Sequence, residues 1–435
     1  MVVGAGAKVL PRRDHPDVES NSRKPASARA SGAGLGSNRD TTRQHNLSTV
    51  LTLVHCSAGI SRAELTRLTG LNRSTIAALV GELAQLGLVL ENEPDQRQQH
   101  GRPSIMISPG PGVLALAVNP DLDAVNVALV ALGGRIVNPV RFHTVAPPST
   151  AEVVNIVSAI YTGMATSLPE NRRVVGVGVA VPGLVDPADG TVIEAPQLGW
   201  QEEPLAAQLS AALNLPVTCA NDAIVGARAQ AAFGAGRDVS DFVYLYGGAS
   251  GIAGGILSGG QLLQGATGFA GQIGHLLVRT DGANCSCGSA GCLEAEVTRE
   301  ELLRATGVPS GQAEDLESTV LGLFESGNAP EALLEILQRQ SRLLAVALRA
   351  LVHQLNPSVF VLGGFLRILA RTMPALLEDA VRVGGARSAP EQVAIELAPL
   401  GDDPVLVGAA ELAFTELLAD PARVLGTASP APIDS

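Results

Sequence analysis

The first periodic pattern along the chain lies in residues 44–108, where apolar residues recur at helical spacing. A first helix is predicted by Leu47, Val50, Leu51 and Val54. Ser61 stands three residues ahead of Glu64, a pair that fits a capping box in which Ser61 caps the first turn and Glu64 reaches back. The second helix should therefore start here and run to about Thr69, before a tight turn at Gly70.

A third helix is predicted to begin after Asn72, a good N-cap residue, and to stop at Gly87. Its buried stripe consists of Ile76, Leu79, Val80, Leu83 and Leu86. Two strand-like segments, 88–91 and 104–108, follow around a polar loop. Three short helices and a hairpin predict a winged helix-turn-helix domain over residues 44–108. The short turn between the second and third helices favours this motif over a generic small helical domain.

The third helix leaves polar and small residues on its outward face near its N-terminus. Arg73 is suited to guanine or phosphate. Ser74 and Thr75 can hold phosphate, and Ala77 can touch a thymine methyl group. In the wing loop, Arg102 stands in a Gly-Arg-Pro sequence that can enter a narrow minor groove. A lone hairpin arginine is more often solvated, so this last role depends on the adjacent helices. The partner predicted from these residues is a double-stranded DNA operator.

Strands and helices alternate along the remainder of the chain, over residues 109–421. Apolar, β-rich runs occur at 113–118, 124–130, 174–181, 217–219, 242–246, 251–257, 359–362 and 393–397. Helical stretches lie between them, for example at 150–168, 224–233 and 331–355. This alternation predicts an α/β fold with largely parallel sheets. The segment is too long for one ordinary core, so we expect two lobes with a cleft between them.

The two ends of the chain lack such periodicity. Residues 1–43 are rich in Gly, Ala, Ser and Arg, which predicts a disordered tail. A solvated tail or a misassigned start codon is favoured over the alternative, a non-specific DNA-tethering arm. Residues 422–435 are predicted to form a flexible C-terminal tail. No apolar run approaches the roughly 18–20 residues that span a bilayer. We also see no secretory h-region, so we expect a soluble cytoplasmic protein that does not bind a membrane.

The formal net charge of −12 is spread unevenly along the chain. Residues 1–105 carry 13 Lys and Arg against 9 Asp and Glu, whereas residues 106–435 carry 17 against 33. Such asymmetry hints at a nucleic-acid-binding end. Residues 44–105, however, carry 5 basic and 5 acidic residues, so the positive excess lies in the tail. DNA contacts must therefore depend on a few placed arginines, and the motif supports DNA binding better than the charge does.

Three of the five cysteines stand within eight residues of one another, as Cys285, Cys287 and Cys292. His275 lies ten residues upstream. One imidazole and three thiolates form a closed tetrahedral set that suits zinc. A closed set leaves no open position for water, so we expect the zinc to be structural. The alternative is a coincidental cluster of reduced thiols, which the rarity of cysteine elsewhere disfavours.

The residues around this cluster resemble a known family. Gly271-Gln-Ile-Gly-His275 followed by Cys285-x-Cys-Gly-x-x-Gly-Cys-Leu-Glu294 is similar to the signature of the ROK family (repressors, open reading frames, kinases). Further segments look like the sugar-binding, Asn-Asp and adenosine-side loops of that family: 179–183, 195–200, 220–223 and 362–364. The resemblance implies an actin-like, two-lobed ATPase-type fold. A winged helix-turn-helix ahead of it is the architecture of the family's transcriptional regulators.

The resemblance also places a catalytic base, because in the family's kinases the aspartate that matches Asp222 takes a proton from the sugar hydroxyl. Those kinases need a first-strand loop of the type Asp-x-Gly-Gly-Thr, and here the corresponding stretch, 116–124, has lost the glycines and the threonine. Pro120 lacks an amide to donate, and Asp121 and Asp123 would repel phosphate. We therefore predict that the chain is not an enzyme and that Asp222 is a vestigial base. The glycine-rich stretch 247–255 is weak evidence for a retained phosphate site.

The predicted effector is a monosaccharide or a sugar derivative. The resemblance assigns its binding to Gly183, Gln197, Asn221, Asp222, Gln272, His275 and Glu294. Family members usually have Glu at the position of Gln272 and often Asn at that of Gln197. Glu to Gln removes a charge and adds a donor, so the preferred ligand should differ from glucose or N-acetylglucosamine, or bind more weakly.

The predicted function is a sugar-responsive transcriptional regulator, and specifically a repressor of carbohydrate metabolism genes. One such domain makes few DNA contacts, so a homodimer or higher homo-oligomer on a palindromic operator is expected. Closing of the cleft around the sugar would change the match to the half-sites. Two alternatives stay open: a sugar kinase with a DNA-binding appendage, and a regulator that a protein partner releases from DNA.

Overall fold

The computed structural model describes residues 37–92, 105–265, 268–384, 393–399 and 404–426. The chain divides into the units Met1–Thr41 and Thr42–Ser435, and the described helices and strands lie in the second unit except for the start of the first helix. Within the described residues, no helix combines the length and the apolar character needed to cross a membrane.

The N-terminal part is built from three helices and a small sheet. The helices are α1 (Ser37–His55), α2 (Arg62–Thr69) and α3 (Arg73–Gln85), and the strands are β1 (Ile60–Ser61), β2 (Val89–Asn92) and β3 (Met106–Pro109). The three strands form an antiparallel sheet in the order β1-β3-β2. Because α1 begins at Ser37, the predicted disordered tail of residues 1–43 is wrong for its last seven residues. The wing loop and its Arg102 lie outside the described residues.

Capping residues set the boundaries of α2 and α3. The Ser61 hydroxyl accepts the amide of Glu64, as predicted, but the Glu64 carboxylate pairs with Arg67 instead of reaching back. Gly70 ends α2 in the left-handed region at φ 69°, a conformation that glycine adopts without steric cost. Oδ1 of Asn72 then accepts the amide of Thr75 at 2.8 Å, which confirms the predicted start of α3.

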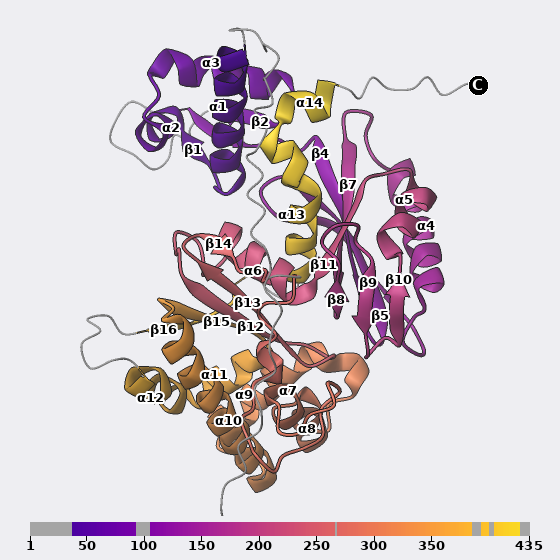
Figure 1. Ribbon diagram of the computed structural model, residues 1–435, viewed down its shortest axis with the longest axis vertical. Coiled ribbons are helices and arrows are strands. Elements are labelled where there is room, and N and C mark those ends of the chain that lie inside the picture. Colours follow the sequence, from indigo (N-terminus) through magenta and orange to yellow (C-terminus); the bar gives the residue numbers. More distant parts are fainter. Residues whose placement is uncertain (1–36, 93–104, 266–267, 385–392, 400–403, 427–435) are drawn as a thin grey trace, which may run out of the picture. The chain divides into compact units, whose positions relative to one another are not determined.

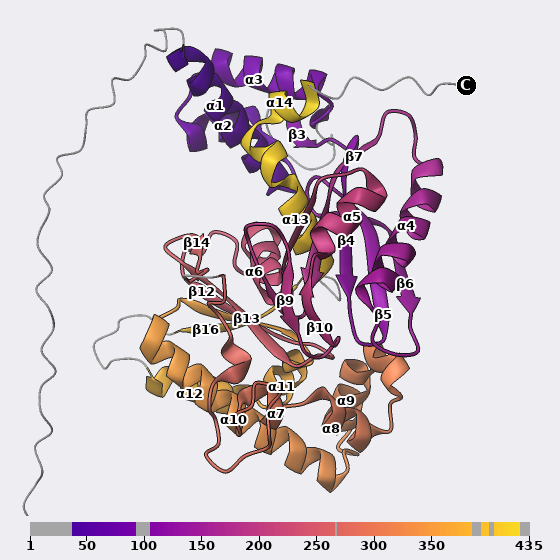
Figure 2. The same cartoon turned by 45° about the vertical axis from the view of Figure 1, so that its right-hand side comes forward.

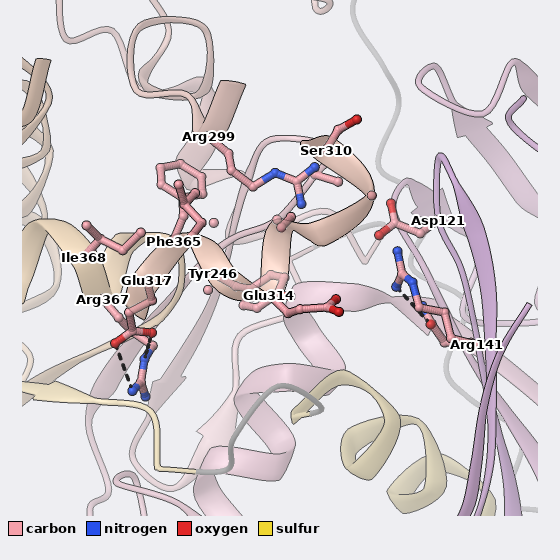
Figure 3. Close-up of a pocket in the computed structure, with 18 of the residues that line it drawn as sticks. Asp121, Arg141, Tyr246, Arg299, Ser310, Glu314, Glu317, Phe365, Arg367 and Ile368 are labelled. Atoms are coloured by element: carbon pink, nitrogen blue, oxygen red, sulfur yellow. Dashed lines mark hydrogen bonds and ion pairs between the residues drawn. The ribbon is translucent and has the colours of Figure 1, made fainter. Parts of the chain in front are cut away.

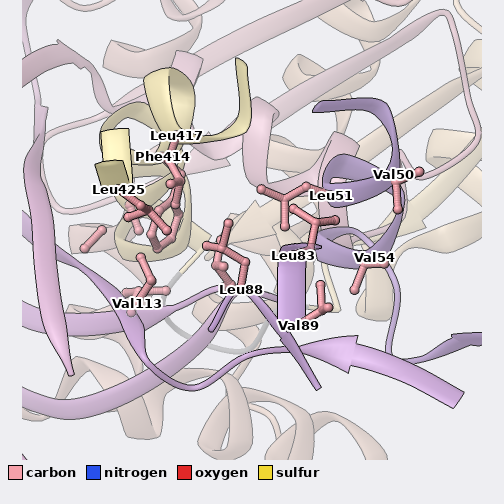
Figure 4. Packing of buried hydrophobic residues seen from close by; sticks show 14 of the residues in the cluster. Val50, Leu51, Val54, Leu83, Leu88, Val89, Val113, Phe414, Leu417 and Leu425 are labelled. Atoms are coloured by element: carbon pink, nitrogen blue, oxygen red, sulfur yellow. The ribbon is translucent and has the colours of Figure 1, made fainter. Parts of the chain in front are cut away.

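The predicted apolar stripes of these helices are buried, except for the half-buried Leu86, and they extend into the rest of the unit. Leu51, Val54 and Leu83 are at most 2% exposed. Figure 4 shows them in one cluster with Leu88, Val113, Phe414, Leu417 and Leu425. The last three come from α13 (Pro404–Ala419) and α14 (Pro421–Gly426). Residues 422–426 are thus helical, and the predicted C-terminal tail of residues 422–435 is wrong for this part.

The first lobe of the following domain is a five-stranded sheet in the order β11-β7-β4-β5-β6. Its strands are β4 (Val113–Pro120), β5 (Ala124–Ala131), β6 (Arg135–His143), β7 (Arg173–Val181) and β11 (Val217–Asn221). Strands β4, β7 and β11 are parallel, whereas β5 and β6 are antiparallel neighbours. A small antiparallel sheet in the order β10-β9-β8 consists of β8 (Leu184–Val185), β9 (Val192–Ala195) and β10 (Trp200–Glu203).

Successive side chains of each strand point to opposite faces of this sheet, so the two faces pack against different helices. Leu114 and Leu116 pack with α4 (Thr150–Thr166) and α5 (Leu205–Leu213). Ala115 and Ala117 face α13, which lies on the opposite side of the sheet (Figure 1). This second face is made of small residues, so the helix approaches closely. A Cβ atom added to Gly178 would lie 1.7 Å from the carbonyl oxygen of Ala409 in α13.

The second lobe is built on a five-stranded sheet in the order β14-β13-β12-β15-β16. Its strands are β12 (Phe242–Gly247), β13 (Ile252–Ser258), β14 (Gln261–Leu262), β15 (Val359–Gly364) and β16 (Ala394–Leu397). One face packs on α6 (Asp222–Phe233). The other face is covered by a helical layer, visible in Figure 2: α7 (Leu293–Glu296), α8 (Arg299–Thr306), α9 (Leu316–Glu325), α10 (Glu331–Leu355), α11 (Leu366–Thr372) and α12 (Pro374–Gly384).

The predicted α/β class and the two lobes agree with this architecture, but the predicted sheet pairing is partly wrong. Each large sheet contains two parallel and two antiparallel pairs, so neither is largely parallel. The apolar runs did not reveal this, because an antiparallel strand buried on both faces is as continuously apolar as a parallel one.

Candidate metal centre and effector cleft

The predicted metal group is assembled. One ligand atom from each of His275, Cys285, Cys287 and Cys292 lies within 4.8 Å of the others. Nδ1 of His275 is 3.5 Å from Sγ of Cys285, and the Sγ atoms of Cys287 and Cys292 are 3.7 Å apart. This group of one imidazole and three thiols could hold a metal ion.

Local backbone geometry brings the four side chains together. His275 ends a 3₁₀ turn, Ile273–His275, and Cys292 is the residue before α7. Between the cysteines the chain curls back, since the amide of Cys285 donates to the carbonyl of Ser289. Gly291 has φ 77°, and a Cβ atom there would lie 1.7 Å from the carbonyl oxygen of Arg279. The loop therefore requires glycine at this position.

Two predicted effector residues lie at the start of α6, and one of them contacts a third, Gly183. Asn221 ends β11 and caps the helix, with Oδ1 accepting the amides of Ala223 and Ile224. Its Nδ2 donates to the carbonyl oxygen of Gly183 at 3.0 Å. Asp222 is the first helical residue and is 8% exposed. The end of a parallel strand and the N-terminus of a helix form a usual place for a ligand in such folds.

Asp222 is held in an environment that disfavours its charge. Burial raises the pKa of its carboxyl to about 7, against a partly opposing hydrogen bond from the amide of Ala223 and with a further rise from nearby Asp121. Asp222 lines a cavity of about 80 Å³ together with Asp121, Asn126, Arg141 and Ser250. A carboxyl that titrates near neutrality can donate or accept a hydrogen bond to a hydroxyl group.

The remaining effector candidates are brought together only in part. Gln272 and Asn221 line one cavity of about 50 Å³. Oε1 of Glu294 is 3.6 Å from Nδ1 of His275, next to the metal group. A Cβ atom on Gly251 would lie 2.8 Å from Oε2 of Glu294, which places this carboxylate against the β12–β13 turn. Gln197 is exposed between β9 and β10, and none of the described contacts connects it to the others.

A larger cavity, of about 600 Å³, opens between the lobes. Figure 3 shows Asp121 and Arg141 on one wall, with Arg299 and Glu314 projecting from the other lobe. Its floor includes Gly247 and Gly248, the start of the glycine-rich stretch.

The turn between β4 and β5 borders this cavity, and its own polar atoms satisfy its amides. The amide of Asp121 donates to the carbonyl of Ala124, and that of Leu122 donates to Oδ1 of Asp121, both at 2.8 Å. Burial raises the pKa of the Asp121 carboxyl, and the hydrogen bond from Leu122 opposes that rise. The turn thus presents carboxyl groups and no free amide from these two residues.

Several charged residues that line the large cavity were not anticipated, among them Arg141 and Arg299. Arg141 lies in β6, a polar strand that the apolar pattern did not predict, and pairs with Asp123 at 2.8 Å. Arg299 opens α8, and its buried Nε atom has no hydrogen-bond partner among the described residues, although it lies 3.8 Å from Oε1 of Glu300. The sequence offered one signal for Arg299, a charged residue at the start of a helix, and this feature is too common to identify a functional site.

The predicted DNA-contacting residues of α3 share its N-terminal end. Arg73 and Ser74 are exposed, and Thr75 and Ala77 are half-buried. The Ser74 hydroxyl donates to Oδ1 of Asn72 at 2.7 Å, so it takes part in the helix cap. Arg73 has no ion pair among the described residues.

The pattern of the ROK family matches residues 117–416. The xylose repressor of Caldicellulosiruptor bescii is 25% identical over 400 residues, which cover 88% of this chain and 99% of that protein. The glucokinase of Streptomyces coelicolor is 30% identical over 302 residues, covering 63% of this chain and 90% of the glucokinase.

Solved structures with the same fold include both classes of protein. A ROK family transcriptional regulator, a homologue of the E. coli MLC protein, superimposes with a TM-score of 0.69 at 23% identity, over 89% of this chain and all of the other. A ROK family glucokinase from Streptomyces griseus, in complex with glucose and AMPPNP, gives a TM-score of 0.59 at 27% identity, over 69% of this chain and 98% of the other.

Proposed function

Because the chain belongs to the ROK family, we propose that it is a sugar-responsive, DNA-binding transcriptional repressor. The extent of the matches carries this proposal. The xylose repressor aligns with 88% of the chain, whereas residues 109–435 are only 327 of 435 residues. That alignment therefore reaches into the helix-turn-helix part, while the glucokinase aligns with 63% of the chain. We assign residues 44–108 to DNA binding and residues 109–421 to effector binding.

The DNA contacts would come from the exposed start of α3. Arg73 offers a guanidinium to guanine or phosphate, and Ser74, Thr75 and Ala77 lie beside it. Arg102 in the wing completes the set. A homodimer would place two such helices on two half-sites, because one domain makes too few contacts to select a single genomic site.

The effector would bind at the start of α6. Within the described residues, Asn221 has one N–H left after its three hydrogen bonds, and Oδ2 of Asp222 has no hydrogen bond. Gln272 and Glu294 would supply further donors and acceptors, with Gly183 and Gln197 on the first-lobe side. D-xylose is the first ligand to test, because the repressors that this chain resembles are named xylose repressors.

The four-residue metal group would hold a structural zinc ion. Zinc bonds of about 2.3 Å to sulfur and about 2.0 Å to nitrogen place tetrahedral ligands about 3.5–3.8 Å apart. The sulfur–sulfur distance of 3.7 Å and the nitrogen–sulfur distance of 3.5 Å match this spacing, and all four ligand atoms lie within 4.8 Å of one another. With Nδ1 as the ligand atom, Nε2 of His275 would remain free to bond the sugar, and the zinc would fix the orientation of this ring.

We further propose that the protein transfers no phosphoryl group. Phosphoryl transfer needs donors around the phosphates. In the β4–β5 turn, Pro120 has no amide and the amides of Asp121 and Leu122 are already bonded. Asp222 would then serve as a hydrogen-bonding group for the sugar and not as a catalytic base.

One set of binding assays tests the proposal. A DNA duplex selected by the purified protein from a random-sequence pool is titrated in a gel shift, with and without D-xylose and a panel of other monosaccharides. We expect specific DNA binding that one sugar weakens. Specific DNA binding that no sugar changes, but that a cell extract abolishes, would favour release by a protein partner. Sugar-dependent ATP turnover that Asp222→Ala abolishes would favour a kinase.

A further inference from the structure

His55, the last residue of α1, is completely buried in a socket that the effector domain provides. The ring of Phe233 approaches its imidazole edge-on, with centroids 5.2 Å apart, and the ring of Phe414 does so at 5.8 Å. Phe233 ends α6, and Phe414 belongs to α13. One side chain of the DNA-binding domain therefore contacts both of these helices.

The hydrogen bonds of the socket fix the tautomer of His55. The amide of Gly133, in the β5–β6 turn, donates to Nδ1 at 3.0 Å, so Nδ1 must carry a lone pair. Nε2 then carries the proton and donates to Oε1 of Glu411 in α13 at 2.9 Å. Both ring nitrogens are satisfied, and the geometry holds only while α13 and the β5–β6 turn keep their places around the ring.

Helix α6 connects this socket to the effector residues. Asn221 and Asp222 stand at its N-terminus and Phe233 at its C-terminus, about 18 Å away for a helix of this length. The helix meets its neighbours at glycine and alanine, without large interlocking side chains, so it can move along them as a rigid element. A Cβ atom on Gly255 of β13 would lie 2.4 Å from Cβ of Ala227, and one on Gly408 of α13 would lie 1.9 Å from the carbonyl oxygen of Val225. A displacement at one end must therefore appear at the other.

We propose that His55 couples the effector cleft to the DNA-binding domain through the relative position of α6 and α13. This inference rests on the proposed function. Sugar binding at Asn221 and Asp222 shifts α6 against α13, which changes the separation of Phe233 from Phe414 and Glu411. The His55 side chain then changes its position between these residues, and the C-terminal end of α1 moves with it. Tightly packed sockets of this kind switch between discrete arrangements.

The test measures coupling separately from binding. The coupling factor is the ratio of the DNA Kd with saturating D-xylose to the DNA Kd without it, and the DNA is a duplex selected from a random pool. In a regulator this factor is typically about 5- to 150-fold. His55→Asn keeps an acceptor for the Gly133 amide but does not reach Glu411. We expect its coupling factor to fall at least about fivefold toward 1, while the Kd for sugar in calorimetry changes by less than about threefold.

A second variant tests the α6 contact alone. Phe233→Leu removes an aromatic edge from the socket but leaves the hydrogen bonds of His55 in place, and it decides the question if His55→Asn does not fold. Matched controls are His353→Asn and Phe142→Leu, both at exposed positions. Folded variants that keep the wild-type coupling factor would overturn the role of His55. A wild-type protein that binds DNA but responds to no sugar would instead reject the proposed function, and this inference with it.

Discussion

Nδ2 of Asn221 donates a hydrogen bond to the carbonyl oxygen of Gly183 over 3.0 Å. Through Oδ1 the same side chain accepts two amides in the first turn of α6. Asn221 thus joins the Gly183 loop to the helix that carries Asp222. A single side chain caps the helix and connects it to the Gly183 loop, and both segments carry proposed effector residues, so the loss of this side chain should weaken both the cap and the proposed sugar binding.

Asn221→Ala should lower the free energy of unfolding by about 1–2 kcal/mol, since it removes an N-cap and leaves the Gly183 carbonyl without its partner. It should also weaken sugar binding by at least tenfold, or about 1.4 kcal/mol. Urea denaturation and calorimetry measure the two effects. Asn72→Ala is the matched control, because Asn72 caps α3 in the same manner. An Asn72 variant that lost sugar binding equally would show that the effect is merely one of stability.

Cys287→Ser should remove the metal and the sugar response together. One of four tetrahedral ligands is lost, and the orientation of His275 and of neighbouring Glu294 depends on the intact set. Elemental analysis should give about one zinc per wild-type chain and far less in the variant. Cys56→Ala, a half-buried thiol outside the group and outside the effector cavities, should keep both zinc and sugar binding. Normal sugar response from zinc-free protein would contradict the positioning role.

Arg73→Ala should weaken DNA binding by about 1–3 kcal/mol, a loss expected for a guanidinium that contacts a base or phosphate. Sugar affinity should not change. Gel shifts at several salt concentrations tell the two contacts apart, since loss of a phosphate contact lowers the salt dependence and affects all sequences alike. Arg304→Ala removes an equally exposed positive charge from α8 and should leave DNA binding intact. Equal losses in both variants would point to net charge alone.

The sequence predicted best those features that depend on neighbours in the chain. The metal group could be found because three of its four ligands lie within eight residues, and α2 and α3 because their caps and stripes are local. Strand β6 was missed because it is an exposed edge strand with Pro139 and with Asn138 at φ 51°. Its polar pattern does not alternate as a half-buried strand should.

The cavity between the lobes could not be predicted from signals between residues that are close in the sequence. Asp121, Arg299 and Arg367 line it from three distant segments, and only the topology of the two sheets brings them together. The socket of His55 is likewise assembled from segments that are distant in the sequence, since Gly133, Phe233 and Glu411 belong to separate elements. Nothing in the spacing of these residues could indicate their contact.

Two glycines should respond to substitution in opposite directions. Gly178→Ala would force a methyl group to 1.7 Å from the Ala409 carbonyl oxygen, so it should destabilise the protein by about 3 kcal/mol or more, or prevent folding. Gly163 lies exposed in α4 with no atom near a new Cβ. Gly163→Ala should stabilise by about 0.5–1 kcal/mol. Thermal and urea unfolding measure both, and a harmless Gly178→Ala would disprove the close contact of α13 with the sheet.

Asp222 should make stability decline as the pH rises. In the folded protein burial raises the pKa of this carboxyl from 3.8 to about 7. Between about pH 4 and pH 7 the folded state therefore keeps a proton that the unfolded chain has released. The free energy of unfolding due to this group falls with rising pH across that window and stays low above it. Below pH 4 both states are protonated, and this contribution vanishes.

Asp222→Asn removes this proton linkage while keeping the size of the side chain. Relative to the wild type, the variant should gain stability between pH 5 and pH 8, by an amount on the order of 2 kcal/mol. Urea denaturation at the two pH values measures the difference, and Asp238→Asn is the control for loss of an exposed carboxylate. A variant that is no more stabilised at pH 8 than at pH 5 would show that Asp222 is charged throughout this range, and so already a hydrogen-bond acceptor for the sugar at neutral pH.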